Sequence, residues 1–97
     1  MLDTLTIADF ETLVDRDVTL RFGEQAQHAR VVEVSRRGQA PEGGREPFSV
    51  IVESGPNDGY WPQGVHAFVH PDHGELALFM VPLGPGETGM RYEIAIN

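Results

Sequence analysis

Three histidines lie close together around one short turn of the chain. His66 and His70 precede the turn, and Asp72 and His73 lie within it. Imidazole and carboxylate groups are common ligands of zinc and related divalent metals. Four residues along a strand span about 13 Å, so one ion cannot bridge His66 and His70. A metal or small-ligand site would therefore use His70, Asp72 and His73 with a group from another strand. In the simpler interpretation, these turn side chains are only solvated.

The aromatic pair Tyr60 and Trp61 is a second candidate site. It lies in residues 54–63, a segment rich in Pro, Asn, Asp and Gly. Aromatic rings on loops are typical of recognition surfaces, because they offer a large contact area at a low entropic cost. Alternatively, Trp61 folds back and covers the end of the hydrophobic core. We favour the second interpretation for Trp61, and we keep Tyr60 and Trp61 as the candidate binding residues.

Motifs for catalysis and for nucleotide binding are weak. Residues 84–89, GPGETG, match the pattern G-x-G-x-x-G. Phosphate binding by that pattern requires a helix to follow, whereas the last eight residues alternate as a strand. The chain has no cysteine, and its serines lack the glycine-flanked turn of a hydrolase nucleophile. Its 15 acidic residues are too many to single out a catalytic pair. We therefore expect no enzyme, no catalytic residue and no cofactor.

The composition describes a small acidic protein. Its 97 residues suffice for one domain, residues 1–97, with a small core. The formal net charge of −8 disfavours a nucleic-acid partner, because phosphate binding draws on clustered positive charge. No segment reaches the roughly 20 apolar residues that cross a bilayer, and the N-terminus lacks the features of a secretory signal. We expect a cytoplasmic protein with no nucleic-acid partner and no membrane partner.

The hydrophobic pattern predicts one helix followed by six strands. The helix is expected at residues 5–15, where Thr6 is the N-cap and Asp9 completes a weak capping box. Its apolar residues fall on one stripe, at Ile7, Phe10, Leu13 and Val14. We expect this stripe to cover an open barrel end or a sheet edge. The strands are expected at residues 17–23, 27–36, 48–53, two arms within 63–83, and 90–97.

The fourth and fifth strands are expected to form a tight hairpin. Residues 71–74, PDHG, suit a type I turn whose last residue is left-handed, a conformation that Gly adopts at little cost. The arm at residues 75–83 is apolar at both alternating sets of positions, which predicts a strand covered on both faces. In the second strand the adjacent Val31 and Val32 break the alternation, which predicts a β-bulge or a sharply bent strand.

Six consecutive strands most simply form an antiparallel meander that closes into a small barrel, giving a mainly β fold with one N-terminal helix. The alternative is a two-layer roll packed on the helix. Residues 38–47, with three Gly and two Pro, are expected to be a mobile hairpin loop. If the barrel is open, the last strand leaves an unpaired edge. We expect a monomer or a weak homodimer that self-associates through that edge.

Several segments resemble a family of short bacterial proteins catalogued only as a domain of unknown function. The similar segments are LTIADFETLVDRDVTLRFG, PFSVIVES, PQGVHAFVHPDHGELALFMVPLG and GMRYEIAIN, which together span nearly the whole chain except residues 38–47. The resemblance carries no established activity and no catalytic residues, so it assigns no role to any position here. It implies an accessory protein, with an association between some members and phage-tail-like gene clusters.

These observations lead to two expected functions. The first is a non-enzymatic structural or protein-interaction domain with an unidentified protein partner, as an accessory of a phage-like or secreted particle. The second is a small-ligand or metal-binding barrel that uses the turn between His70 and His73.

Overall fold

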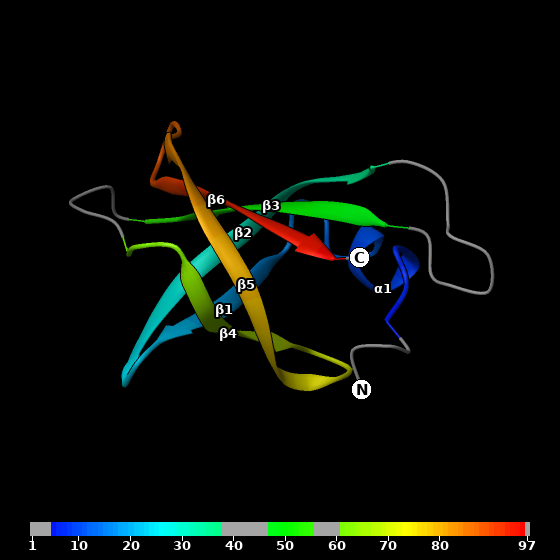
Figure 1. Cartoon of the computed structure of the whole chain (residues 1–97), viewed down its shortest axis with the longest axis horizontal. Helices are drawn as coiled ribbons and strands as arrows, with labels where there is room; N and C mark the ends of the chain where they lie inside the picture. The colour runs from blue at the N-terminus through cyan, green and yellow to red at the C-terminus, as the bar shows by residue number, and fades with distance from the viewer. Residues whose placement is uncertain (1–4, 38–46, 56–60, 97) are drawn as a thin grey trace.

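Six antiparallel strands close into a barrel, with one short helix near one end (Figure 1). The computed structural model describes residues 5–37, 47–55 and 61–96. The elements are α1 (Ala8–Glu11), β1 (Asp17–Phe22), β2 (Gln25–Arg36), β3 (Phe48–Ser54), β4 (Gly64–His70), β5 (Gly74–Pro85) and β6 (Met90–Ile96). The predicted fold class is confirmed, with a barrel in place of the alternative roll. Most of the predicted 38–47 loop lies outside the described residues.

The order of strands around the barrel is β1-β2-β3-β6-β5-β4, so the predicted simple meander is wrong. Two three-stranded meanders, β1 to β3 and β4 to β6, are joined where β3 pairs with β6 and where β1 pairs with β4. The consecutive strands β3 and β4 are therefore not neighbours, and β4 lies beside β1. A hydrophobic pattern within each strand cannot predict this order, because it depends on pairing between distant segments.

Closure of the barrel removes the free edge that the sequence suggested for the last strand. β6 pairs with β3 on one side and with β5 on the other. The narrowest seam is between β1 and β4, where three residue pairs are in register from Thr19↔Val69 to Arg21↔Ala67. Self-association by pairing two copies of β6 along an open edge is therefore inconsistent with this fold.

The helix is shorter than predicted, because α1 spans only Ala8–Glu11 instead of residues 5–15. The N-cap is Ile7, not the predicted Thr6, and it makes no side-chain cap bond, although the carboxylate of Asp9 accepts a hydrogen bond from the backbone N–H of Thr6 at 2.8 Å. After α1 the backbone N–H of Asp15 donates to the carbonyl of Val31 on β2 at 2.7 Å. Asp15 has a φ of 67°. Pairing with β2 therefore ends the helix early. Among the described residues, no helix is long and apolar enough to cross a membrane.

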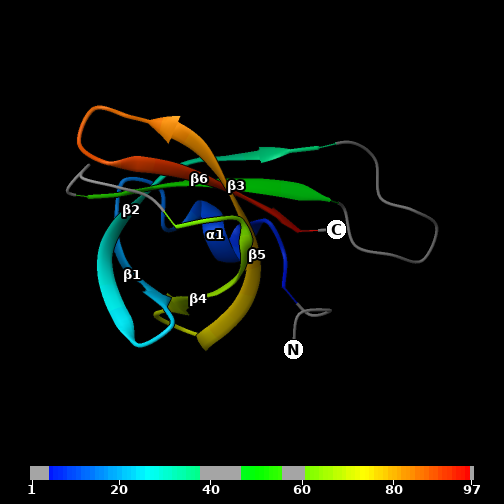
Figure 2. The same cartoon turned by 60° about the vertical axis from the view of Figure 1, so that its left-hand side comes forward.

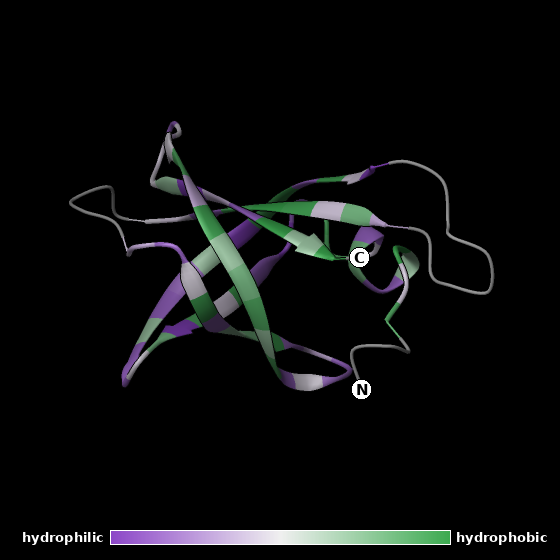
Figure 3. Ribbon diagram, viewed as in Figure 1, coloured by the Kyte–Doolittle hydropathy of each residue, from purple (hydrophilic) through white to green (hydrophobic). Residues whose placement is uncertain are grey.

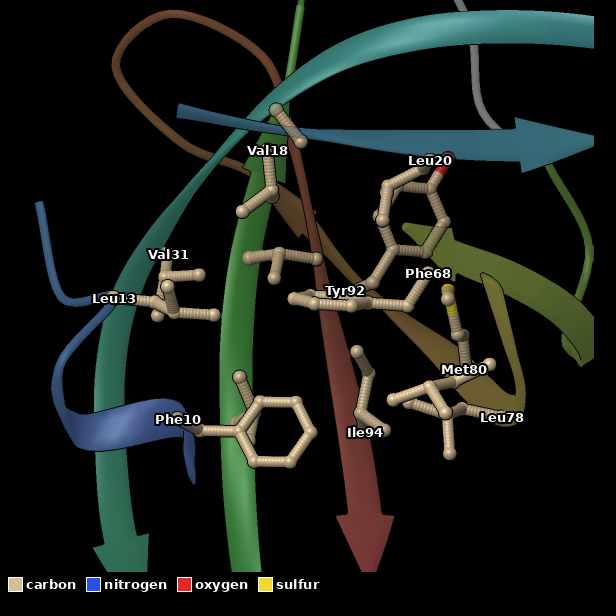
Figure 4. Packing of buried hydrophobic residues seen from close by; sticks show 14 of the residues in the cluster. Phe10, Leu13, Val18, Leu20, Val31, Phe68, Leu78, Met80, Tyr92 and Ile94 are labelled. Atoms are coloured by element: carbon tan, nitrogen blue, oxygen red, sulfur yellow. The ribbon is translucent and has the colours of Figure 1, made fainter. Parts of the chain in front are cut away.

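The apolar stripe of the N-terminal segment covers one end of the barrel, as predicted. Phe10 and Leu13 are buried and belong to the same cluster as Tyr92 and Ile94 (Figure 4). The Phe10 ring packs on Phe48 and Phe68 at centroid distances of 5.6 and 5.5 Å. In the turned view α1 lies among the surrounding strands (Figure 2). Residues 5–16 thus act as a plug that contacts strands from both halves of the chain.

The pattern of β1 and the irregularity of β2 agree with the sequence prediction, whereas the burial pattern of β5 differs from it. Val18, Leu20 and Phe22 are buried on alternate positions of β1. The register with β3 shifts between Val31 and Glu33, which confirms the predicted bulge. β5 alternates between buried and exposed positions, so the expectation that both of its faces are covered is wrong. The strand buried at nearly every position is β3.

Candidate functional site

The outer face of the β4–β5 hairpin carries exposed apolar side chains. The predicted turn forms, with Gly74 at a φ of 76°, and it sets the register that places Val65 opposite Phe79. His70 and Phe68 point inward and are buried, so the alternate residues of β4 point outward. Val65 is 64% exposed and Phe79 is 46% exposed. Two large apolar side chains therefore lie side by side in water, and β5 is hydrophobic along most of its length (Figure 3).

The apolar surface continues along β5 toward its C-terminal end. Leu83 is 54% exposed. Beside it, an open hollow of about 270 Å³ is lined by Pro82, Leu83, Gly84 and Met90. We call the surface formed by Val65, Phe79, Val81, Leu83 and this hollow the β5 face. Single exposed apolar residues are ordinary, but a contiguous group of this kind is typical of an interaction site.

Trp61 covers one end of the core. Its ring stacks on Phe22 with a centroid distance of 5.1 Å and an interplanar angle of 2°. Its backbone N–H donates a hydrogen bond to the hydroxyl of Tyr92 at 2.9 Å, and burial raises the pKa of Tyr92. The Phe22 ring also contacts the edge of His66. This geometry is the core-covering arrangement that we favoured for Trp61, whereas Tyr60 lies outside the described residues.

We predict a blue-shifted tryptophan emission that acrylamide quenches slowly, because Trp61 is the only tryptophan and is stacked on Phe22. Phe22→Ala is expected to shift the emission to the red and to raise the quenching constant. Phe79→Ala is the matched control, since Phe79 lies on the outer surface. An emission spectrum of the wild-type protein like that of tryptophan in water would contradict this packing.

His70 is a buried structural side chain. Its Nδ1 accepts hydrogen bonds from the backbone N–H groups of Asp72 at 3.0 Å and His73 at 3.3 Å. Because Nδ1 accepts, the ring proton is on Nε2, which donates to the carbonyl oxygen of Asp9 at 2.7 Å. The ring also packs edge-on against Phe10. His70 therefore fixes the β4–β5 turn and joins it to the N-terminal plug.

The predicted turn residues come together, but not in the arrangement of a metal centre. His73 Nε2 lies 3.2 Å from the carboxylate of Asp9. The backbone N–H of Thr6 and the His73 ring lower the pKa of Asp9. Asp72 is exposed and supplies its backbone N–H to His70. Within the described ranges, no group of three His, Cys, Asp or Glu residues could hold a metal ion. A metal at His70 would have to displace bonds at one of its two nitrogens.

A buried carboxylate, Glu53, holds the β5–β6 turn. Its side chain is 1% exposed and accepts hydrogen bonds from Arg91 Nε at 2.7 Å and from the backbone N–H and hydroxyl of Thr88. These bonds, those from the Thr88 side chain first, lower the pKa of Glu53 to about 2. A Cβ at Gly86 would overlap the Glu53 carboxylate, and one at Gly89 would overlap the β3 backbone. Gly84 and Pro85 of the GPGETG segment belong to β5, and residues 86–89 form the turn, where close contacts give a structural reason for Gly86 and Gly89.

A family model described as a domain of unknown function (DUF6916) matches residues 5–96. The chain belongs to this family. The matched range includes α1 and all six strands. No curated protein and no solved structure matches the chain. The geometry of its own side chains is therefore what points to a function for this DUF6916 domain.

Sequence reasoning about this DUF6916 domain missed the β5 face and the buried Glu53. The sequence did contain one signal for the β5 face, because a tight turn at residues 71–74 pairs residue 65 with residue 79. Combined with an inward-pointing Phe68, that register places Val65 and Phe79 on the outside. No local sequence signal indicated that Glu53 is buried, because its partners Thr88 and Arg91 are more than 30 residues away in the chain.

Proposed function

We propose that this protein is a non-enzymatic structural or protein-interaction domain, and that it binds a protein partner through the β5 face. The observation that carries the proposal is the exposed Val65 and Phe79 pair, with the exposed Leu83 further along β5. Interfaces of this type bury aromatic and aliphatic anchors at their centre. The open hollow at Pro82 and Met90 offers a place for an apolar side chain of the partner.

The buried polar side chains form hydrogen bonds inside the fold, which supports a role without catalysis. Glu53 is engaged by Thr88 and Arg91, and His70 is engaged at both ring nitrogens. A general acid or base needs a group that can reach a substrate, and these groups are occupied inside the fold. The alternative function, metal or small-ligand binding at the His70 turn, is less well supported, because it would break the bonds that fix this turn.

The biological setting of the proposal comes from the family resemblance. The resemblance to short bacterial proteins, some of them associated with phage-tail-like gene clusters, supports a role as an accessory of a phage-like or secreted particle, and we propose that this role is carried out from the cytoplasm. An interaction module with no chemistry of its own fits such a role.

Site-specific photocrosslinking tests the proposed surface. We expect benzoylphenylalanine at position 79 to give one discrete adduct in the native lysate, because the ring would enter the partner's interface. The same group at exposed Ala26, on the part of β2 that pairs with β1, is the matched control. Val65→Ser should reduce the adduct about tenfold, since hot-spot side chains in one interface act together. Equal adducts from positions 79 and 26, or none from position 79, would refute the proposal.

A further inference from the structure

On the outer surface of the barrel, a row of neighbouring side chains across adjacent strands contains two carboxylates with an apolar side chain between them. Glu33 on β2 is in register with Ile51 on β3. Ile51 is in register with Glu93 on β6, and Glu93 is in register with Val81 on β5. Neighbours in register on adjacent antiparallel strands point to the same side. The row therefore reads Glu33, Ile51, Glu93 and Val81, and its last member belongs to the β5 face.

Among the described residues, the two carboxylates of this row have no charged partner, whereas Glu53, two residues beyond Ile51 on β3, is paired with Arg91. Within the described part of the chain, neither Glu33 nor Glu93 has an ion pair or a side-chain hydrogen bond. The adjacent cations are already engaged, since Arg91 binds Glu53 and Arg30 lies 3.3 Å from Asp15. The carboxylates of this row are thus available to an external cation.

Docking of a purely apolar surface on this row would be unfavourable. It would remove water from Glu93, which lies between the apolar residues Ile51 and Val81. Desolvation of a carboxylate without a compensating cation strongly opposes binding, because the charge loses its hydration and gains nothing in return. A cation on the partner offsets this cost and makes the contact selective for that partner.

We infer that the partner of the β5 face is a basic amphipathic protein segment, whose apolar side chains cover Phe79 and Val81 and whose Arg or Lys residues pair with Glu33 and Glu93. This inference rests on the proposed function and adds the chemistry of the partner. Glu33 and Glu93 lie two strands apart, which corresponds to about 10 Å. A single metal ion cannot bridge that distance, but two cations can match it.

A second copy of this chain is a poorer occupant of the same surface. Each copy carries a formal net charge of −8. Two copies related by a two-fold axis over this row would bring the same unpaired carboxylates toward each other, since a two-fold interface is self-complementary. Like charges facing each other in an interface oppose association, whereas a basic segment gains from the acidic balance of this protein.

The spacing specifies a peptide probe. On an α-helix, residues i and i+7 are about 10.5 Å apart along the axis, and i+3 and i+4 lie between them on the same face. The probe is a helical peptide with Arg at i and i+7 and Leu at i+3, i+4 and i+11, so that the last Leu lies beyond Glu93, on the side of Val81 and Phe79. The control peptide keeps all three Leu residues and has Glu at i and i+7.

Binding is measured by fluorescence anisotropy of the labelled peptides at several salt concentrations. We expect the Arg peptide to bind and the Glu peptide to bind at least about tenfold more weakly. The double variant Glu33→Gln and Glu93→Gln should weaken the Arg peptide about tenfold and flatten its salt dependence. Glu24→Gln, in the turn between β1 and β2, is the matched control and should change the affinity less than about twofold.

The outcomes separate the inference from the proposed function. If Phe79→Ser abolishes binding of the Arg peptide while the double Gln variant leaves it unchanged, the inference of a basic partner is wrong. The proposal that the β5 face binds a partner is then still supported. If the crosslinked partner of position 79 is captured but the Arg peptide does not bind, the inference also fails. Sedimentation that shows a stable dimer lost in Phe79→Ser would overturn it in favour of a second copy. Unchanged Arg-peptide binding in Phe79→Ser would count against the β5 face itself.

Discussion

Phe10→Ala is expected to destabilise the protein by about 3 to 5 kcal/mol, which is the range for removing a buried aromatic ring. Phe10 is fully buried and contacts Phe48 on β3, Phe68 on β4 and His70. Loss of the ring leaves a cavity between the N-terminal plug and both halves of the barrel. Domains of this size have a total stability of about 5 to 15 kcal/mol, so the variant would be close to unfolding.

Urea unfolding followed by circular dichroism and Trp61 emission measures this loss. Phe79→Ala is the matched control, because it removes the same ring from the outer surface and should cost about 1 kcal/mol or less. A similar loss for the two variants would show that Phe10 is not an essential part of the core. Amide exchange at residues 5–16 and in β3 reports whether the plug and the barrel are destabilised together.

Glu53→Gln is expected to lower the free energy of unfolding by about 2 to 3 kcal/mol, because a buried and hydrogen-bonded carboxylate is replaced by an amide. The amide cannot accept from Thr88 and Arg91 as the carboxylate does, and the Arg91 charge loses its partner. The β5–β6 turn should loosen first. Glu75→Gln, which removes an exposed ion pair with Arg21 at 3.4 Å, is the control and should cost under about 1 kcal/mol.

The same carboxylate predicts a specific dependence of stability on pH. The folded pKa of Glu53 is about 2, below its ordinary value of 4.5. A lowered carboxyl pKa contributes stability that is complete above the unfolded pKa and is lost as the pH falls through the folded pKa. The wild-type urea midpoint should therefore decline from about pH 4.5 toward pH 2. Asp9, whose pKa is also lowered, adds a smaller loss in the acid range.

In Glu53→Gln this acid-dependent decline should be reduced, because the group that takes up the proton is absent. Unfolding curves from pH 7 to pH 2 for both proteins measure the difference. Parallel declines in the two proteins would mean that Glu53 is not the residue linked to acid stability, and the hydrogen bonds from Thr88 would then have no measurable effect on its pKa.

Local sequence signals were sufficient for the parts of the fold that depend on near neighbours. The alternation of Val18, Leu20 and Phe22 gave the inner face of β1, and the adjacent Val31 and Val32 indicated the bulge in β2. The PDHG segment indicated a turn with Gly74 in the left-handed region. Each of these features follows from side-chain period or backbone preference within a few residues.

The candidate site was only partly accessible to such reasoning. The histidine turn was found, but hydrogen bonds from the backbone of Asp72 and His73 make His70 a structural residue. The apolar pattern of β5 was recognised, but it indicated a strand covered on both faces, whereas Phe79 is exposed. Apolar residues on both faces predict cover only if a neighbouring element provides it, and for the β5 face that element would be the proposed partner.

The sequence alone therefore determined the mainly β fold class, the approximate strands, the tight turn and the inward face of β1, because these depend on periodicity and turn chemistry. Only the tertiary structure decided the strand order, the early end of α1 at its pairing with β2, and the burial of Glu53 beneath the β5–β6 turn. Those features depend on contacts between residues far apart in the chain. The free energy of such contacts is set by which surfaces meet, and a local pattern does not contain that information.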